Sequence, residues 1–296
     1  MKHRKIAFVI NPKSGSDRKT DRVKLVEKLI SDNYRSEIIP WKKITDRNEI
    51  FDRVKSEGYD VVVAVGGDGT VSQLADTLCG TNIALGIIPF GSGNGLARHL
   101  GVPVKSAAAM KLIENGVVKK IDRGKINNRS FFCTAGVGFD AHIGKLFAES
   151  KTRGFWTYGK MTVKEFRNYV PEKYSIDIDG KKMEREAFLI AVANGGQYGN
   201  NAWIAPKANA CDGILHVSIL KPFHFWNTIG IARKMFGKKL DTSEFLETFT
   251  GKKIIINRKS EGAAHFDGEP DAMGKELTIT IDPGILNVVV PESFCG

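Results

Sequence analysis

The chain has 296 residues, of which 42% are hydrophobic and 26% charged, and its formal net charge is +11 at pH 7. This length exceeds one typical domain of roughly 100–150 residues, so two domains are expected. The excess of cations would suit nucleic acid, an anionic membrane surface or a nucleotide. However, the cations form no run of five, and no RNA-binding or zinc-finger signature occurs. We therefore expect no nucleic-acid partner.

The expected compartment follows from the cysteines and the apolar runs. Cys79, Cys133, Cys211 and Cys295 are far apart and form no Cys-x-x-Cys pair, which is typical of reduced thiols. The N-terminal apolar run is too short for a secretion signal, and no run approaches the ~18 apolar residues of a membrane span. We expect a cytoplasmic protein whose membrane contact is peripheral, at the inner face, and not integral.

The first part of the chain alternates strand-like apolar runs with segments of helical spacing. Strands are predicted at Ile6–Ile10, Ser36–Pro40, from Val61, and at Ile83–Ile88; helices are predicted at Thr20–Ser31, Asp46–Ser56, from Thr70, from Leu96, and at Ser106–Asn115. Such alternation predicts an α/β domain with a doubly wound, mostly parallel sheet. We assign this domain to residues 1–126.

From Val117 onward most apolar runs are typical of strands, punctuated by glycine and asparagine, and we assign residues 127–284 to a second domain. Strands are predicted at Val117–Ile126, Ser130–Ala135, Tyr174–Ile178, Ala187–Ala193, Leu215–Leu220, Lys253–Ile256 and Leu277–Ile281, with helical interruptions at Ala141–Tyr169 and Phe223–Phe236. This pattern predicts an antiparallel β-sandwich with inserted helices. The tail, residues 285–296, holds one more strand (Ile285–Val290), which is a candidate to return to the first domain.

Three glycine-bearing turns, at residues 11–15, 66–70 and 91–95, each follow a predicted strand. The carboxyl ends of parallel strands share one edge of a sheet, where ligands bind. The glycines of the second turn allow close backbone approach, and Thr70 and Ser72 place hydroxyl and N–H groups at a helix start, where phosphate binds well. The turns therefore predict a phosphate-handling site. The alternative is an ordinary βα turn.

The second domain contributes candidate acids. In an extended segment Asp267 and Glu269 would face the same way, so one could accept a proton while the other holds Mg²⁺. The alternative, favoured by this segment alone, is a hairpin turn at Asp267-Gly268. Asp122 follows a strand and is either a third acid of a metal network or a turn acid.

A loop around Asp212 is a weaker candidate. Its carboxylate and the backbone carbonyls of Asn209 and Ile214 could close a small hard-cation site, although a plain Asp-Gly turn also fits. The run Gly136–Asp140 is an incomplete dinucleotide fingerprint and carries no prediction of its own. The histidines include no His-x-x-x-His pair, so no catalytic zinc is expected.

Taken together, these residues resemble the diacylglycerol kinase catalytic family of soluble bacterial lipid kinases, to which sphingosine and ceramide kinases are close and NAD kinases more distant. The matching motifs occur in order along nearly the whole chain: Asn11-Pro12-x-Ser14-Gly15, Gly66-Gly67-Asp68-Gly69-Thr70, Pro89–Asn94, Asp122-x-Gly124, Gly136-x-Gly138-Phe139-Asp140, Asp212-Gly213 and Phe266-Asp267-Gly268-Glu269. The resemblance implies transfer of the γ-phosphoryl group of ATP, with Mg²⁺, to a hydroxyl of a lipid presented at a membrane surface. It places the active site in a cleft between the domains.

The resemblance also assigns roles to single residues. Asp267 matches the family's general base; Glu269, with Asp68 and Asp122, matches the acidic network around the catalytic Mg²⁺; and Asn209, Asp212 and Ile214 match a structural Mg²⁺ site. The residues that match nucleotide contacts are Asn11, Pro12, Lys13, Ser14, Gly15, Thr45, Gly66, Gly67, Asp68, Gly69, Thr70, Ser72, Ser92, Gly93 and Asn94.

One position departs from the family pattern. Bacterial diacylglycerol kinases usually carry Gly-Thr-x-Asn-Asp, whereas this chain has Gly91-Ser92-Gly93-Asn94-Gly95, which looks more like the sphingosine and ceramide kinases. The lipid acceptor therefore stays open between diacylglycerol and a long-chain base. Two further alternatives are a small-molecule kinase of the NAD kinase type and a nucleotide- or lipid-binding protein without catalysis. A homodimer is an option that the sequence does not decide.

Overall fold

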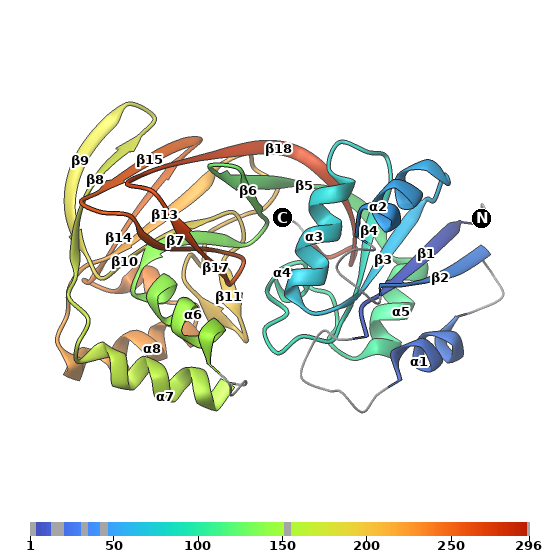
Figure 1. Ribbon diagram of the computed structural model, residues 1–296, viewed down its shortest axis with the longest axis horizontal. Coiled ribbons are helices and arrows are strands. Elements are labelled where there is room, and N and C mark those ends of the chain that lie inside the picture. Colours follow the sequence, from blue (N-terminus) through green and yellow to red (C-terminus); the bar gives the residue numbers. More distant parts are fainter. Residues whose placement is uncertain (1–3, 13–20, 31–34, 42–46, 151–154, 295–296) are drawn as a thin grey trace. The chain divides into compact units, whose positions relative to one another are not determined.

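The computed structural model describes residues 4–12, 21–30, 35–41, 47–150 and 155–294. The chain divides into two compact units, which we call unit 1 (residues 1–121 and 284–296) and unit 2 (residues 122–283). Two strands belong to both: β5 (Val117–Ile126) leaves unit 1 and β18 (Glu276–Val290) returns to it (Figure 1).

Unit 1 is built on a parallel sheet whose strands follow the order β2-β1-β3-β4, with the last part of β18 beside β4. The strands are β1 (Lys5–Ile10), β2 (Arg35–Pro40), β3 (Val61–Gly66) and β4 (Ala84–Pro89). Every residue of β3 and β4 is buried. This explains their continuous apolar sequences, because a strand covered on both faces has no polar side.

Helices connect these strands, as the alternating pattern predicts. They are α1 (Arg22–Leu29), α2 (Arg47–Ser56), α3 (Asp68–Leu78), α4 (Gly95–His99) and α5 (Ser106–Asn115). In α3 the buried residues Val71, Leu74, Ala75 and Leu78 recur at helical spacing and form the face that packs on the sheet. The helix begins at Asp68, two residues before the predicted start.

The described part of unit 2 contains two large antiparallel sheets and a small one in which β11 pairs with β12. One large sheet has the order β14-β13-β10-β7-β16-β17; in the other, β15 pairs with β8 and with the first part of β18, and β9 lies beyond β8. The strands are β6 (Arg129–Phe131), β7 (Thr134–Gly138), β8 (Glu172–Ile178), β9 (Lys181–Ala187), β10 (Leu189–Ala193), β11 (Gln197–Gly199), β12 (Ala202–Trp203), β13 (Leu215–Leu220), β14 (Leu246–Gly251), β15 (Lys253–Arg258), β16 (Gly262–Phe266) and β17 (Glu269–Met273).

Strand β10 shows how the layers are organised. Its residues Ile190 and Val192 lie in the core between the two sheets, together with Ile254 and Ile256 of β15. Its alternate residues, such as Ala191, belong to a second core under a layer of helices. Successive side chains of a strand face opposite ways, so this central strand must be apolar throughout.

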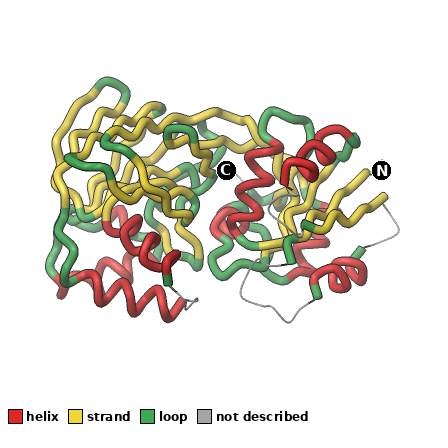
Figure 2. The backbone as a smooth tube through the Cα atoms, viewed as in Figure 1, coloured by secondary structure: helices red, strands yellow, loops and turns green. Residues whose placement is uncertain are grey.

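The helical layer of unit 2 consists of α6 (Phe139–Glu149), α7 (Phe155–Phe166), the 3₁₀ turn η2 (Phe225–Asn227), α8 (Thr228–Phe236) and the 3₁₀ turn η3 (Leu240–Thr242). Helices α6, α7 and α8 gather on one side of the unit 2 strands (Figures 1 and 2). The predicted fold class is confirmed: an α/β domain with a mostly parallel sheet and an antiparallel β-sandwich with inserted helices.

Several predicted elements differ in detail. The helical interruption at residues 141–169 is two helices, the strand at residues 130–135 is divided between β6 and β7, and the last two predicted strands are the single strand β18. Strands β9, β11, β12, β14, β16 and β17 were not predicted as strands. The sequence of β9 (Lys-Lys-Met-Glu-Arg-Glu-Ala) hides its strand because it is mostly exposed and charged. No helix of the described residues is long and apolar enough to cross a membrane.

Candidate functional site

In unit 1 Asn11 and Pro12, the described part of the first turn, lie with the 66–70 and 91–95 turns at the carboxyl edge of the sheet, because β1, β3 and β4 are parallel. The side chain of Asn11, which follows β1, donates from Nδ2 to Oγ1 of Thr70 over 3.2 Å. Thr70 is buried in the first turn of α3, directly after Gly66 and Gly67. The first two turns are thus in contact, as the strand–helix alternation predicts.

Asp68 links the second turn to the third. Its Oδ2 accepts a hydrogen bond from the backbone N–H of Asn94 (2.9 Å), and its Oδ1 accepts one from that of Gly95 (2.6 Å). The side chain of Asn94 closes the turn by accepting from the N–H of Gly91 and donating to its carbonyl, both over 2.8 Å. A Cβ at Gly91 would lie 3.0 Å from Cα of Gly67, so only glycine allows this approach.

The start of α3 offers backbone donors. Its N-cap, Gly67, supplies no side-chain hydrogen bond, and the first intrahelical bond runs from the N–H of Val71 to the carbonyl of Gly67. The preceding N–H groups point out of the helix start, where the helix dipole favours an anion. This arrangement can hold phosphate oxygens without a charged side chain.

The other predicted nucleotide contacts are placed as follows. Gly69 lies in the first turn of α3, Ser72 is half-buried one turn further on, Pro12 and Ser92 are exposed, and Gly93 is half-buried in the third turn. Lys13, Ser14, Gly15 and Thr45 lie outside the described residues.

Two cations at the same edge were not predicted. Arg22, at the start of α1, is 3% exposed; its Nη1 donates to the carbonyl of Asn11, and its guanidinium lies 4.9 Å from the ring centroid of Phe90. Nε of Arg98 donates to the carbonyl of Gly93 over 3.2 Å. No local motif marks either arginine. Arg98 contacts the turn before its own helix, and Arg22 contacts both Asn11, in the turn before its own helix, and Phe90, which follows β4. Both add positive charge beside the glycine turns.

In unit 2, Asp267 lies in the two-residue turn between β16 and β17. The φ angles of Asp267 (47°) and Gly268 (82°) are both positive, and the last paired residues are Phe266 and Glu269. These are the features of a tight hairpin. The extended arrangement that would place Asp267 and Glu269 on one face is therefore wrong; the hairpin alternative is correct. Glu269 is exposed at the start of β17.

The carboxylate of Asp267 turns back onto the chain between β6 and β7. Its Oδ2 accepts from the N–H of Phe132 (2.8 Å), and its Oδ1 accepts from those of Cys133 (2.7 Å) and Thr134 (3.2 Å). The N–H of Asp267 donates in turn to the carbonyl of Thr134 over 2.8 Å. Such donors fix the orientation of the carboxylate.

Arg258 anchors the same hairpin from its open end. This buried guanidinium donates to the carbonyls of Gly262, Ala263, Met273 and Gly274 over 2.7–3.1 Å. Burial lowers the pKa of Arg258, while nearby Tyr174 and Glu172 oppose that shift. The hairpin is therefore held at both ends, which restricts the position of Asp267.

A polar cluster with one buried member, His265, lies next to Asp267 in the sheet. Oδ2 of Asp140 contacts Nε2 of His265 (2.8 Å) and accepts from the hydroxyl of Tyr198 (2.6 Å). His265 is 4% exposed, and its Nδ1 has no hydrogen-bond partner among the described residues. Because a carboxylate only accepts, Nε2 carries the imidazole proton. Asp140 ends the Gly136–Asp140 motif, which was the available signal for this cluster.

Asp122 is 1% exposed and connects to Asp267 through Asn194. Nδ2 of the fully buried Asn194 donates to the carbonyls of Asp122 (3.0 Å) and Phe132 (2.9 Å), and Phe132 in turn donates to Asp267. The carboxylate of Asp122 accepts from the N–H of Gly213 over 2.7 Å. The structure thus brings Asp122 and Asp267 into one hydrogen-bond network, with Asp122 holding the 209–214 loop.

Within that loop the candidate metal ligands form local turns. Oδ1 of Asn209 accepts from the N–H of Cys211 (2.8 Å), and Oδ1 of Asp212 accepts from that of Ile214 (3.0 Å). These are side-chain turns of the kind that asparagine and aspartate form readily. They fix both side chains in an exposed loop and leave further oxygen lone pairs for other contacts.

Comparisons with known proteins cover almost the whole chain. The model of the diacylglycerol kinase catalytic domain matches residues 5–126, and that of the YegS C-terminal NAD kinase beta sandwich-like domain matches residues 133–290. The chain belongs to the diacylglycerol kinase family. A probable lipid kinase, YegS-like, of Pseudomonas aeruginosa is 28% identical over 255 residues, which cover 83% of this chain and 82% of that protein.

Solved structures agree with this family. A crystal structure from Bacillus anthracis, provisionally assigned as a diacylglycerol kinase, has a TM-score of 0.78 and 26% sequence identity, with 98% of each chain covered. An NAD kinase from Archaeoglobus fulgidus, solved with ATP, has a TM-score of 0.54 at 13% identity, with 97% of this chain and 94% of that one covered. The latter likeness shows a common fold and no more.

Membership of the diacylglycerol kinase family raises the question of Mg²⁺. Among the described residues, no three His, Cys, Asp or Glu side chains gather closely enough to form a metal site on their own. The 209–214 loop supplies carboxylate, amide and carbonyl oxygens, a donor set that suits a hard cation. The residues of this loop therefore fit a hard cation such as Mg²⁺.

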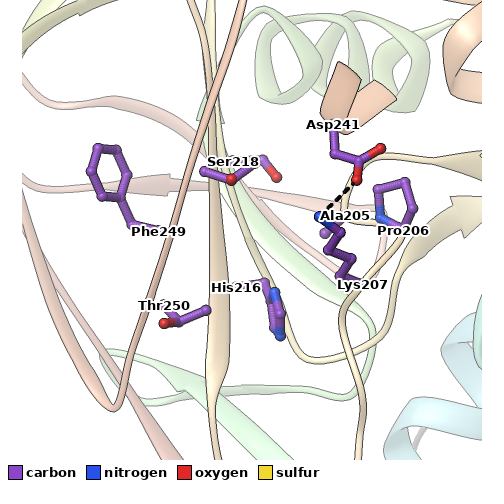
Figure 3. A pocket seen from close by; sticks show the side chains of 9 residues that line it. Ala205, Pro206, Lys207, His216, Ser218, Asp241, Phe249 and Thr250 are labelled. Atoms are coloured by element: carbon purple, nitrogen blue, oxygen red, sulfur yellow. Dashed lines mark ion pairs between the residues drawn. The ribbon is translucent and has the colours of Figure 1, made fainter. Parts of the chain in front are cut away.

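A cavity of about 190 Å³ in unit 2 is lined by residues of β13, β14 and the preceding loop, including His216, Ser218 and the ion pair of Lys207 with Asp241 (3.1 Å; Figure 3). In the sheet order, β10 and β7 separate β13 from β16, which precedes Asp267. The cavity is therefore distinct from the hairpin that carries the candidate base.

Proposed function

We propose that this chain is an ATP- and Mg²⁺-dependent lipid kinase, which transfers the γ-phosphoryl group of ATP to a hydroxyl of a lipid such as diacylglycerol or a long-chain base. The observation that supports the proposal is the contact of Asn11, the 66–70 turn and the 91–95 turn at one sheet edge, beside the start of α3, whose N-cap Gly67 supplies no side-chain hydrogen bond. Membership of the diacylglycerol kinase family gives this phosphate-binding arrangement its reaction class.

In the proposed reaction the lipid hydroxyl oxygen forms a bond to the γ-phosphorus as the bond from that phosphorus to the β,γ-bridging oxygen breaks. The hydroxyl proton passes to the carboxylate of Asp267. Three backbone N–H groups hold this carboxylate in one orientation, and orientation is what a general base most needs. Phosphoryl transfer depends mainly on positioning and on charge neutralisation, so Asp267 accounts for a share of about 10²–10⁴-fold.

The remaining residues bind and orient. The backbone N–H groups at the start of α3, with Asn11 and the 91–95 turn, hold the ATP phosphates, and Asp68 keeps the third turn in place. When bound, Mg²⁺ supplies neutralisation of the phosphate charge. Asp68, Glu269 and Asp122 are the proposed acidic residues around it, and Asn209, Asp212 and Ile214 would hold a second, structural ion.

A second acceptor class is supported by Gly95. This residue is buried at the start of α4, and its N–H donates to Asp68. Because glycine has no side chain, the turn carries no second carboxylate at this position. The glycine turn resembles that of sphingosine and ceramide kinases, which favours a long-chain base. Diacylglycerol and a long-chain base therefore both belong in the acceptor panel.

The test is transfer of radiolabelled γ-phosphate from ATP, with Mg²⁺, to diacylglycerol, sphingosine, ceramide and a total lipid extract. The wild-type chain is compared with Asp267→Asn and with Asp179→Asn. Asp179 is a matched control: it lies with Gly180 in another Asp-Gly turn with positive φ angles, and its carboxylate also accepts backbone N–H groups.

We expect the wild type and Asp179→Asn to label the same lipid and Asp267→Asn to lose at least 100-fold in rate, with ATP affinity retained. Thermal melting of both variants shows whether the lower transfer rate of Asp267→Asn reflects a slower reaction or a less stable fold. No labelled lipid from any acceptor would overturn the proposal. NADP⁺ formation from NAD⁺ would then indicate a small-molecule kinase, and ATP binding without turnover a binding protein.

A further inference from the structure

Helix α8 has apolar side chains on two faces. Ile231 is 6% exposed and packs in the core under the helical layer, whereas Ile229 is 72% and Phe236 is 49% exposed. Trp226, in η2 directly before α8, is 87% exposed. The spacing of residues 226, 229, 233 and 236 places them along one line on the outer side of the helix.

This outer line is unusual for the chain. Of the eight large hydrophobic residues exposed among those that the structure describes, four lie between residues 225 and 236. The ring centroid of Phe225 lies 6.0 Å from that of Trp226, so the aromatic part is continuous. A contiguous apolar patch in contact with water carries a cost in free energy and marks an interaction surface.

The same segment is strongly basic. Residues 221–239 include five lysines and arginines and no acidic residue. Arg233 lies on the outer line between Ile229 and Phe236, and Lys238 and Lys239 follow the helix, all three exposed. The guanidinium of Arg167, the residue directly after α7, lies 5.6 Å from the ring centroid of Phe225. Cations therefore surround the apolar line.

We propose that η2, α8 and the following lysines, with Arg167, form a docking surface for an anionic lipid bilayer. The tryptophan, isoleucine and phenylalanine side chains enter the headgroup region, and the cations bind lipid phosphates. Interfacial amphipathic helices bind membranes through these same two contributions. A segment that has five cations and no acidic residue between residues 221 and 239 complements a bilayer of anionic lipids. The inference rests on the proposed function for its biological sense, since a lipid kinase must reach a lipid in a membrane.

The experiment measures binding of the full chain, without nucleotide, to vesicles of phosphatidylcholine alone and with added phosphatidylglycerol. The variants are Trp226→Ala with Ile229→Ser, and Arg233→Gln with Lys238→Gln and Lys239→Gln. Matched controls remove an exposed valine elsewhere (Val118→Ser) and three exposed cations of the β8–β9 and β14–β15 turns (Lys181→Gln, Lys182→Gln, Lys252→Gln). Tryptophan fluorescence with brominated lipids, compared with Trp226→Phe, reports insertion at this position.

We expect tight binding only with phosphatidylglycerol, about tenfold weaker binding for the apolar variant and about 100-fold weaker binding for the triple charge variant. The controls should bind as the wild type does, and quenching should be lost in Trp226→Phe. Equal loss in variants and controls, or wild-type binding that ignores anionic lipid, would overturn the proposal. So would a wild-type dimer in light scattering that Trp226→Ala with Ile229→Ser dissociates, because the surface would then join two copies. Because no ATP is present, failure here is distinct from failure of the kinase assay.

Discussion

Unit 2 contains two Asp-Gly hairpin turns that are nearly alike in backbone and differ in their surroundings. Asp179-Gly180 joins β8 to β9 with φ angles of 50° and 88°, and Asp267-Gly268 joins β16 to β17 with 47° and 82°. In both, the aspartate carboxylate accepts backbone N–H groups of a neighbouring segment, from Lys252 and Lys253 in one case and from residues 132–134 in the other.

The comparison shows that a carboxylate that accepts hydrogen bonds from backbone amides can stabilise a hairpin turn, and that this arrangement alone does not indicate a catalytic residue. Around Asp179 the neighbours are exposed lysines. Around Asp267 they are the half-buried side chains of Asp140 and Tyr198, the buried imidazole of His265 and the buried amide of Asn194. Buried polar groups are costly to place, so it is the neighbourhood of Asp267 that indicates function.

Asp68 in unit 1 extends the comparison and gives the largest expected effect. Asparagine at this position keeps one acceptor and turns an amide N–H₂ toward a backbone N–H, so the 91–95 turn must move. We expect Asp68→Asn to lower turnover by about 10³-fold and to weaken ATP binding at least tenfold. Kinetics with isothermal titration of ATP checks both.

The control for Asp68 is Asp52→Asn, which changes an exposed carboxylate on α2. It should leave turnover and ATP affinity within twofold of the wild type. If Asp68→Asn lost turnover but bound ATP normally, Asp68 would act on the reacting groups directly and not through the turn.

The second effect concerns the neighbourhood that distinguishes Asp267. Asp140→Asn removes the charge that the imidazole of His265 and the hydroxyl of Tyr198 share. Since one buried acceptor then serves two donors poorly, we expect the free energy of unfolding to fall by about 3 kcal/mol and turnover to fall about tenfold. Urea denaturation and the transfer assay measure the two quantities.

Tyr198→Phe is the milder companion, because it removes a single hydrogen bond of 2.6 Å. Its expected cost is about 1 kcal/mol. A double-mutant cycle of Asp140→Asn with His265→Gln should show coupling of at least about 0.5 kcal/mol; additive effects would mean that the cluster does not act as a unit.

The third effect tests whether the two hairpins are equivalent as structures. Asp267→Asn and Asp179→Asn each weaken hydrogen bonds from backbone N–H groups, so we expect each to lower the free energy of unfolding by no more than about 1 kcal/mol. Similar losses of stability, with loss of turnover in Asp267→Asn alone, would separate structure from catalysis. A much larger loss in Asp267→Asn would assign that residue a mainly structural role.

The sequence predicted the unit 1 edge because the rule that builds it is local. Strand, turn and helix follow one another along the chain, so the turn after each parallel strand arrives at a common edge without knowledge of distant pairing. The contacts of Asn11 with Thr70 and of Asp68 with Asn94 are direct consequences. Arg22 escaped prediction because its partners, Asn11 and Phe90, are set by the folded turns.

The unit 2 cluster could not be predicted in the same way. Asp140 and His265 are 125 residues apart, and they meet because β16 pairs with β7 in a register that no local pattern fixes. The segment Phe223–Phe236 was correctly predicted to be largely helical, but its periodicity does not tell which apolar residues face water. Trp226 and Ile231 are both apolar residues of this segment, yet their side chains are 87% and 6% exposed.

The smallest expected effect is the pH dependence of the Asp179 hairpin. The backbone N–H groups of Lys252 and Lys253 hold the pKa of Asp179 below its usual value. The unfolded chain takes up this proton near pH 3.9 and the folded chain only at lower pH, so the unfolded state binds more protons in between. The contribution of Asp179 is therefore complete above about pH 4 and is lost as the pH falls through the folded pKa.

Because Asp179 is exposed, solvent screening keeps this contribution below about 1 kcal/mol. Denaturation by urea between pH 5 and pH 3 should give a shallower loss of stability in Asp179→Asn than in the wild type. Lys252→Gln should keep most of the wild-type slope, because the backbone N–H groups are the larger causes of the lowered pKa of Asp179 and the ammonium group of Lys252 adds a smaller attraction. If Lys252→Gln reduced the pH dependence of stability as much as Asp179→Asn does, the charge of Lys252, and not the backbone N–H groups, would be what lowers the pKa of Asp179. The two hairpins would then be alike in backbone conformation only.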